Sequence, residues 1–272
     1  MILYQKKDAT KTMESGQFHG QLPLSPEYAE ELRIWRSLGL PYTKVASTYT
    51  SLIEDVTQKR FGGPDYIIHA LGPMRQRHMD NIRSFDPDFF LTLNPEFTSY
   101  EDWVQLRHWD LYLEVIRGYE PVAESPYHVF WKRAKPVRQA QGLKLDIVPT
   151  AGGWISSPNP GPPGVFTVSV SYHVTNTWDQ VPVLGKLPRF LVKRSAVNPH
   201  GVAMVCGNAV SLPPQESFWQ FPILLNTGEL ASLECLTALN ITGAKLELGK
   251  ASMVLASDSP LKIRALVADG KK

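Results

Sequence analysis

The chain has 272 residues, 43% of them hydrophobic, and a formal net charge of +2, so it is long and apolar enough for a real core and is not intrinsically disordered. Only Cys206 and Cys235 occur, without metal-ligand spacing, which excludes a disulfide-rich secreted scaffold. No stretch approaches the roughly 18 consecutive apolar residues of a membrane-spanning helix, and the N-terminus lacks the apolar core of a signal peptide. We therefore expect a soluble protein inside the cell, in the cytoplasm or the nucleus.

Residues 1–24 are polar and carry three lysines, while glycines and a proline interrupt any periodic pattern. This composition predicts a mobile basic arm. Residues 25–140 follow as an α-rich part. Its first predicted helix has Ser25 as the N-cap, Pro26 at the first helical position and Gly39 as the closing residue. Further predicted elements are a helix that follows Pro41 and includes Val45 to Val56, a helix over residues 73–85, and short strands over residues 65–71 and 88–93.

The strongest helical signal of the chain lies between Phe97 and Gly118. Thr98 and Glu101 form a capping box, and Gly118 is predicted to end the helix in a left-handed conformation. We expect one continuous, buried helix that serves as the scaffold of the α-rich part. Its apolar residues recur at steps of three and four: Trp103, Leu106, Trp109, Leu113 and Ile116.

Helical periodicity disappears from Leu143 onward, and segments rich in β-branched residues take its place. The clearest of them, Val165 to Val174, alternates with a period of two. Seven or eight such segments predict a β-rich part over residues 141–272, and the proline-rich residues 156–164 are expected to be an exposed loop or an interdomain connector. The predicted fold class is therefore α+β: a helical N-terminal half followed by an antiparallel β-sandwich or barrel-like C-terminal half, which share one core or form two domains.

The small net charge hides an uneven distribution. Residues 61–130 contain 5 Lys/Arg and 11 Asp/Glu, a balance of −6, whereas residues 131–200 contain 9 and 2, a balance of +7. The basic residues form two groups, both candidates for binding the phosphates of RNA or of anionic lipid. The alternatives are a solvated charged face without a ligand, and a head-to-tail contact between the basic block of one molecule and the acidic block of the next. The first group is Lys132, Arg133, Lys135, Arg138 and Lys144, and the second is Lys186, Arg189, Lys193 and Arg194.

No local pattern marks a catalytic, cofactor or metal site. The seven histidines are not spaced as metal ligands, and the common nucleotide-binding, hydrolase and metalloprotease motifs are absent. His108 and Asp110 are close in sequence, but nearby helical residues point in different directions, so we assign them to packing. The sequence predicts no cofactor and no metal. The alternative functions are an enzyme whose site is assembled from distant residues, using His173 or His200, and a nucleic-acid binding module.

Part of the predicted central helix resembles a viral family. Phe97, Ser99-Tyr100, Asp102, His108-Trp109-Asp110 and Tyr112 are similar to the segment of rhabdovirus matrix proteins in which a strand leads into a helix containing Tyr and Trp-Asp. In addition, Ser25-Pro26-Glu27-Tyr28 resembles the PPxY late motif through which matrix proteins recruit budding machinery, with Ser25 in place of the first proline. The resemblance implies partner binding by Ser25, Pro26 and Tyr28.

A second resemblance lies in the β-rich part. Val197-Asn198, Met204, Gly207-Asn208-Ala209-Val210-Ser211 and Pro213 are similar to a stretch of cypovirus polyhedrin, which crystallises around virions. Both families are viral assembly proteins without enzymatic activity. Together with the charge blocks, they lead us to expect a matrix-like structural protein of the virion that forms homo-oligomers. Its basic face is expected to bind ribonucleoprotein or an anionic membrane.

Overall fold

The chain folds into two compact units in the computed structural model. Unit 1 consists of Met1–Val104, Leu111–Arg138 and Arg264–Lys272, and unit 2 of Gln105–Asp110 and Gln139–Ile263. The structure describes residues 26–39, 44–48, 73–97, 100–134, 142–151, 153–175, 189–198, 201–212, 216–235 and 245–267. The predicted arm over residues 1–24 and the predicted strand over residues 65–71 lie outside these ranges.

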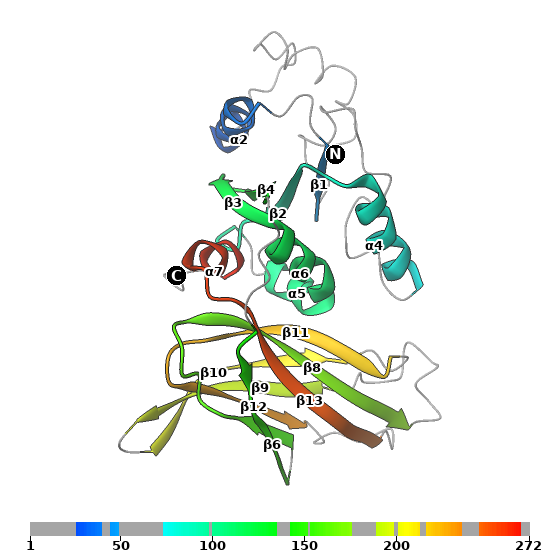
Figure 1. Ribbon diagram of the computed structural model, residues 1–272, viewed down its shortest axis with the longest axis vertical. Coiled ribbons are helices and arrows are strands. Elements are labelled where there is room, and N and C mark those ends of the chain that lie inside the picture. Colours follow the sequence, from blue (N-terminus) through cyan, green and yellow to red (C-terminus); the bar gives the residue numbers. More distant parts are fainter. Residues whose placement is uncertain are drawn as a thin grey trace. The chain divides into compact units, whose positions relative to one another are not determined.

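Unit 1 is built on a mixed four-stranded sheet with the strand order β1-β2-β4-β3 (Figure 1). β1 pairs with β2 in parallel, whereas β4 pairs with β2 and β3 in the antiparallel direction. The strands are β1 (Val45–Ser47), β2 (Phe89–Leu93), β3 (Tyr119–Glu124) and β4 (His128–Arg133).

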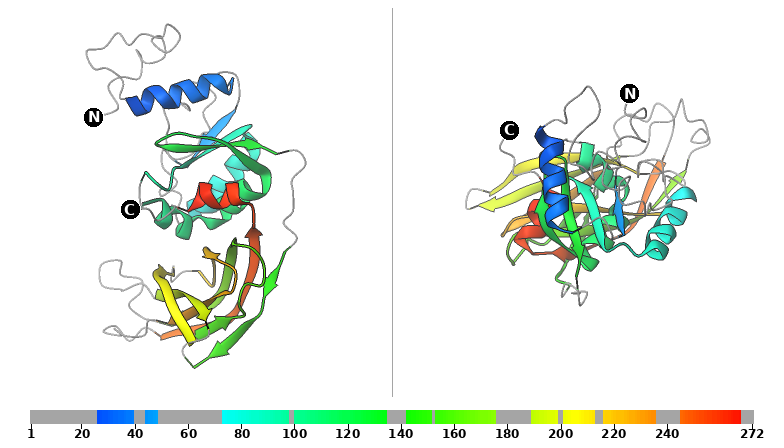
Figure 2. Two further views of the ribbon diagram at one scale, coloured as in Figure 1. Left: turned by 90° about the vertical axis from the view of Figure 1, so that its left-hand side faces the viewer. Right: turned by 90° about the horizontal axis from the view of Figure 1, so that it is seen from above.

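Helices cover both faces of this sheet, which is why all five residues of β2 are buried. On one face, Leu32 and Trp35 of α2 (Pro26–Ser37) share an apolar core with Leu91. On the other face, Phe90 lines a cavity together with Leu111 of α6 (Trp109–Gly118). The left view of Figure 2 shows α2 and α6 on opposite sides of this sheet. The other helices are α4 (Pro73–Phe85), α5 (Tyr100–Arg107), α6 (Trp109–Gly118) and α7 (Pro260–Leu266).

The helix predicted between Phe97 and Gly118 is two helices, because the helical conformation is interrupted at His108. The carbonyl oxygen of Leu106 accepts a hydrogen bond from the indole Nε1 of Trp219 at 3.1 Å. The Nε1 of Trp109 donates to the Oγ1 of Thr167 at 3.0 Å. These hydrogen bonds to residues of unit 2 that are distant in sequence fix residues 105–110. The local sequence pattern therefore does not indicate the break between the two helices.

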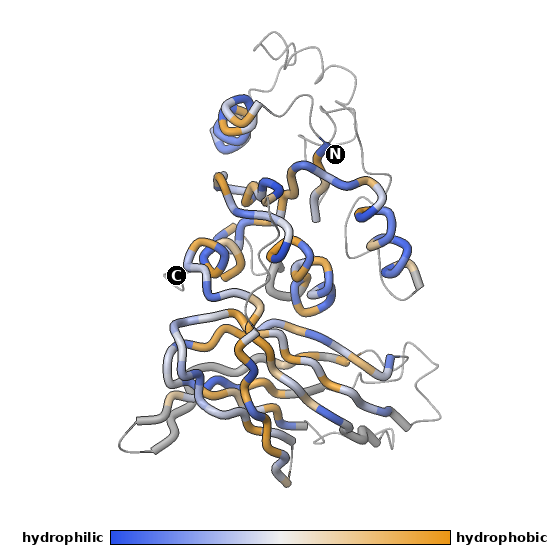
Figure 3. The backbone as a smooth tube through the Cα atoms, viewed as in Figure 1, coloured by the Kyte–Doolittle hydropathy of each residue, from blue (hydrophilic) through white to orange (hydrophobic). Residues whose placement is uncertain are grey.

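Unit 2 consists of two antiparallel sheets with the strand orders β10-β9-β12-β7-β6 and β11-β8-β13-β5. Residues from both sheets form one apolar core, which includes Trp154, Phe166, Phe221 and Leu233. Hydrophobic residues run along the strands of both sheets (Figure 3). The strands are β5 (Lys144–Leu145), β6 (Ile147–Thr150), β7 (Gly153–Ser156), β8 (Gly164–Thr175), β9 (Arg189–Asn198), β10 (Gly201–Ser211), β11 (Phe218–Leu225), β12 (Glu229–Cys235) and β13 (Lys245–Ser257).

The proline-rich stretch 156–164 is a loop inside unit 2 and joins β7 to β8. Its four prolines are exposed, while the side chain of Asn159 is buried. The amide Nδ2 of Asn159 donates to the carbonyl oxygens of Pro162 at 2.9 Å and of Leu225 at 3.3 Å. The loop is therefore fixed to the strand end at Leu225 and is not an interdomain connector.

The predicted fold class is wrong. Residues 25–140 do not form a helical half, because unit 1 contains a four-stranded sheet, and none of the sheets among the described residues closes into a barrel.

The expected helix after Pro41 is also wrong in its first turn, where β1 pairs with β2. Three residues are too few to show a period of their own, and the partner strand is distant in sequence. β3 was missed because Pro121 and a register shift interrupt its pattern.

Candidate functional site

The two predicted basic groups occur in different surroundings, and two residues of the first group lie at the end of β4. Lys132 is exposed, and its Nζ lies 6.0 Å from the centroid of the Phe89 ring. Arg133, the last residue of β4, is half-buried. Lys144 is exposed at the start of β5 in unit 2. Lys135 and Arg138 lie outside the described residues.

Arg133 is held in a fixed position by the turn between α4 and β2. Its Nε and Nη2 donate to the carbonyl oxygen of Pro87 at 3.1 and 2.6 Å, and its Nη2 lies 2.5 Å from the Oδ1 of Asp86. Its guanidinium carbon lies 5.2 Å from the centroid of the Tyr119 ring. Among the described residues, Nη1 has no hydrogen-bond partner. The guanidinium is therefore oriented by its Nε and Nη2, while its Nη1 donors are available to a ligand.

Asp86 owes its position to an unusual backbone conformation. It follows the last residue of α4, and its φ of 52° lies in the left-handed region, where Asp is tolerated better than a bulky residue. Its N–H still donates to the carbonyl oxygen of Ile82 at 3.0 Å, as in a helix. This conformation brings the Asp86 carboxylate beside Arg133.

A cavity of about 220 Å³ lies beside Arg133, between α4, α6 and the sheet of unit 1. Its charged lining consists of two ion pairs, Arg83 with Glu114 and Arg133 with Asp86. These four charges cancel, so the cavity is not an anion site as a whole. Its apolar lining comes from Ile82, Phe90, Leu111 and Val115.

Tyr119 also lines this cavity, and its hydroxyl is buried. It donates to the carbonyl oxygen of Pro87 at 2.8 Å and accepts from the Nη2 of Arg133 at 3.2 Å. Burial raises the pKa of Tyr119 to about 12, and the positive charge of Arg133 opposes the rise only in part. Tyr119 is therefore a neutral hydrogen-bonding group at physiological pH and not a nucleophile.

Lys44 joins Lys132 and Arg133 at the same turn, although it lies far from them in the sequence. Its Nζ donates to the carbonyl oxygen of Phe85 at 3.1 Å, and its backbone N–H donates to the Oδ2 of Asp88 at 3.0 Å. The pairing of β1 with β2, and of β2 with β4, brings Lys44 to this position. We call Lys44, Lys132 and Arg133 the basic corner. The place of Lys44 in this corner is not evident from the sequence, because only strand pairing indicates its neighbours.

The second basic group lies on β9 in unit 2. Lys193 forms an ion pair of 2.6 Å with Glu234, and the Nη1 of Arg194 donates to the carbonyl oxygen of Leu224 at 3.3 Å. Because adjacent strand residues point to opposite faces, these two cations do not form one surface. Arg189 is the first residue of β9, but its side chain is outside the described part of the structure. Lys186 lies outside the described residues.

Two of the three predicted late-motif residues lie at the start of α2. Pro26 is its first residue, Tyr28 is in its first turn, and Ser25 lies outside the described residues. Burial raises the pKa of Tyr28, with smaller contributions from Tyr127 and Glu31. Proline-rich motifs are bound in an extended conformation, so recognition of this segment as a late motif requires unwinding of the first turn of α2.

Tyr28 belongs to a cluster of three aromatic rings that no sequence pattern predicts. Its ring centroid lies 4.8 Å from that of Tyr127, and the ring of Phe97 meets Tyr127 edge-on at 4.9 Å. The exposed fractions of Tyr28 and Phe97 are 37% and 50%. We call these three residues the aromatic patch. They come from α2, the turn after β2 and the turn between β3 and β4, so no local pattern connects them.

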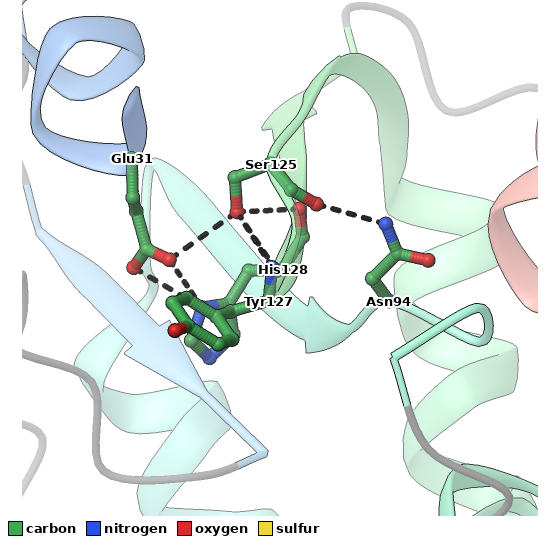
Figure 4. A network of polar contacts seen from close by, with 5 residues as sticks. All are labelled: Glu31, Asn94, Ser125, Tyr127 and His128. Atoms are coloured by element: carbon green, nitrogen blue, oxygen red, sulfur yellow. Dashed lines mark hydrogen bonds and ion pairs between the residues drawn. The ribbon is translucent and has the colours of Figure 1, made fainter. Parts of the chain in front are cut away.

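A buried polar network connects the same three segments (Figure 4). The Nδ1 of His128 lies 3.1 Å from both carboxylate oxygens of Glu31. The Oγ of Ser125 donates to Glu31 at 3.2 Å and accepts from the backbone N–H of His128 at 2.9 Å. The amide Nδ2 of Asn94 donates to the carbonyl oxygen of Ser125 at 2.8 Å.

This network is not arranged as a Ser-His-acid catalytic triad. In such a triad the serine hydroxyl is hydrogen-bonded to the ring of the histidine, whereas Ser125 is bonded to the carboxylate of Glu31. All three side chains are also buried. Glu31, Ser125 and His128 therefore serve to hold α2 against the turn between β3 and β4.

Among the described residues, His, Cys, Asp and Glu side chains form no group of three that would hold a metal ion. None of the helices there is long and apolar enough to cross a membrane. His173 is exposed on β8, and His200 lies outside the described residues.

Comparison with known proteins yields distant structural likenesses. No family model matches the chain, and no curated protein matches it. Among solved structures, the Eiger TNF from S. frugiperda has 14% identity and a TM-score of 0.23, with 43% of this chain and 87% of that chain covered. The stem and receptor-binding domain of the spike protein P1 from bacteriophage PM2 has 9% identity and a TM-score of 0.21, with coverages of 47% and 69%.

Proposed function

We propose that the protein is a non-enzymatic structural protein, matrix-like in its role, that associates with itself and binds ribonucleoprotein or an anionic membrane through the basic corner. The observation that carries the proposal is the geometry of Arg133. A guanidinium whose Nε and Nη2 are fixed by Pro87 and Asp86 loses little conformational entropy when its Nη1 binds a phosphate oxygen.

Lys132 and Lys44 add to the positive charge at this turn. Lys132 is exposed and has no acidic partner among the described residues, so it needs to break no ion pair before it meets a phosphate. Lys44 lies on the opposite side of the turn, with its Nζ at the carbonyl oxygen of Phe85. Asp86 and Asp88 reduce the net charge, which favours modest affinity. The binding that remains is electrostatic, so it should weaken as the salt concentration rises.

Unit 2 contributes less to this proposal. Lys193 is paired with Glu234, and Arg194 is bonded to a backbone carbonyl oxygen. A phosphate that binds Lys193 would have to displace Glu234, and the favourable energy of the new contact would be offset by the loss of the old one. Lys144 is exposed but stands apart from this pair on β5.

The proposal is tested with the purified chain by sedimentation velocity and by co-pelleting with RNA, with neutral vesicles and with vesicles that contain phosphatidylserine. We expect self-association and pelleting with the anionic ligands at low salt, both weakening as NaCl rises. Lys132→Glu should weaken pelleting, whereas Lys250→Glu, an equal charge change at an exposed residue of β13, should not. A chain that stays monomeric and binds neither RNA nor anionic vesicles at low salt contradicts the proposal.

A further inference from the structure

The aromatic patch and the basic corner lie at opposite ends of the same sheet. His128, beside the patch, pairs with Leu93 at the end of β2, and Lys132, in the corner, pairs with Phe89 at its start. β4 therefore runs from one surface to the other, and both belong to unit 1. Each copy presents the two surfaces in opposite directions along its strands.

The aromatic patch is rigid before any partner arrives. Asn94 connects the two turns that carry Phe97 and Tyr127, because its backbone N–H donates to the carbonyl oxygen of Tyr127 at 2.8 Å while its side chain bonds Ser125. The carboxylate of Glu31 fixes α2, and with it Tyr28, to the same turn. Aromatic side chains held in place in this way are typical of the residues that dominate binding at protein interfaces.

The charges around the two surfaces are complementary. Glu27 and Glu96 are exposed and are the chain neighbours of Tyr28 and Phe97. The corner presents two lysines and an arginine beside Asp86 and Asp88, so its net charge remains positive. Cations bind favourably over aromatic faces as well as to carboxylates. A partner that fits the patch therefore carries cations on a compact surface. The basic corner of a second copy has this chemistry.

We infer that the aromatic patch of one copy receives the basic corner of the next copy. This inference rests on the proposed function, in which the protein assembles with itself, and it names the two surfaces that meet. Since the two surfaces differ, the contact is head-to-tail: each copy keeps one of them free, and repetition gives a ring or an open filament. The same corner would also meet phosphates, so RNA and assembly compete for it.

The experiment measures association of single and mixed variants by sedimentation velocity at low salt. Phe97→Ser should remove the patch, and Lys132→Glu should reverse a charge in the corner, so that each variant alone associates at least about tenfold more weakly than wild type. A mixture of the two should form dimers that do not grow further, because each variant keeps the surface that the other lacks. A head-to-tail contact predicts that the wild type grows beyond dimers, whereas the mixture of the two variants stops at dimers.

The matched controls are the same types of substitution at exposed residues that belong to neither surface. Phe218→Ser replaces a phenylalanine that is 51% exposed on β11, close to the 50% of Phe97, and Lys250→Glu reverses an exposed lysine on β13. Both should associate as wild type does. Glu96→Lys is a second patch variant that removes no apolar packing. It should also associate weakly by itself and should pair with Lys132→Glu.

The outcomes separate this inference from the proposed function. If the wild type associates and Phe97→Ser and Glu96→Lys associate equally well, the patch is not the contact, and the inference is overturned while the proposed function stands. If the mixture of variants forms no dimers, the head-to-tail geometry is overturned. A wild type that never associates at low salt overturns the inference and the self-association in the proposed function, whereas co-pelleting tests the proposed binding of RNA or anionic membrane separately. A wild type that associates, variants that do not, and a mixture that gives dimers support the inference.

Discussion

Tyr119 is the residue for which the structure gives the sharpest expectation. Its hydroxyl donates to the carbonyl oxygen of Pro87 and accepts from Arg133, so it braces the guanidinium on which the proposed function depends. Tyr119→Phe removes both hydrogen bonds and leaves a buried carbonyl oxygen with fewer donors. We expect the free energy of unfolding to fall by about 1–2 kcal/mol at neutral pH, as measured by urea unfolding.

The same residue makes stability depend on pH in the alkaline range. Its pKa in the folded chain, about 12, is above the ordinary value of 10.0, so the fold favours the protonated hydroxyl. This contribution is complete below about pH 10 and is lost as the pH rises toward 12. The advantage of the wild type over Tyr119→Phe should therefore shrink across this interval. A constant difference between the two proteins from pH 9 to 12 contradicts the assignment.

At the scale of elements, replacing each of two glycines by alanine is expected to have contrasting effects on stability. Gly228 lies in the turn between β11 and β12 with a φ of 77°, whereas Gly118 ends α6 without a positive φ. Neither Cβ would meet a neighbouring atom within 4 Å, so backbone conformation alone separates them. Gly228→Ala should lower the free energy of unfolding by about 1 kcal/mol. Gly118→Ala should leave it unchanged or raise it by up to about 1 kcal/mol, and chemical denaturation measures both.

Gly118 also shows why local patterns predict some elements and not their ends. The left-handed stop expected there is wrong, because α6 leads directly into β3 and the sheet takes over the backbone hydrogen bonds. α4, β2 and β8 were predicted because each carries a full period of its own pattern. β1 and β4 were not, since their structure depends on pairing with distant segments.

The candidate site also combines residues that a local pattern indicates with residues that only distant pairing brings together. Lys132 and Arg133 are evident from local charge density, but the sequence does not show that Asp86 and Pro87 fix the guanidinium. Lys44 reaches the corner only through strand pairing. The aromatic patch joins three segments that are distant in sequence, so composition and periodicity carry no signal for it.

At the scale of the whole molecule, the chain passes between its two units more than once. Residues 105–110 belong to unit 2, although the residues on both sides of them belong to unit 1. Trp109 is fully buried, with its Nε1 bonded to Thr167, and Leu106 packs against the core of unit 2. The prediction of two consecutive parts, divided near residue 140, did not include this exchange.

Unit 2 should therefore depend on a segment outside its main sequence range. Trp109→Ala leaves a large cavity and an unpaired Thr167 hydroxyl, and it should lower the stability of unit 2 by about 3–5 kcal/mol in urea unfolding followed by circular dichroism. A fragment of residues 139–263 lacks residues 105–110 entirely and should be weakened at least as much without any substitution. Val122→Ala, an exposed change on β3, serves as the control and should alter stability by less than about 0.5 kcal/mol. If the fragment unfolds at the same urea concentration as unit 2 of the whole chain, Trp109 and Leu106 add nothing to that core, and the division of the chain into these units is wrong.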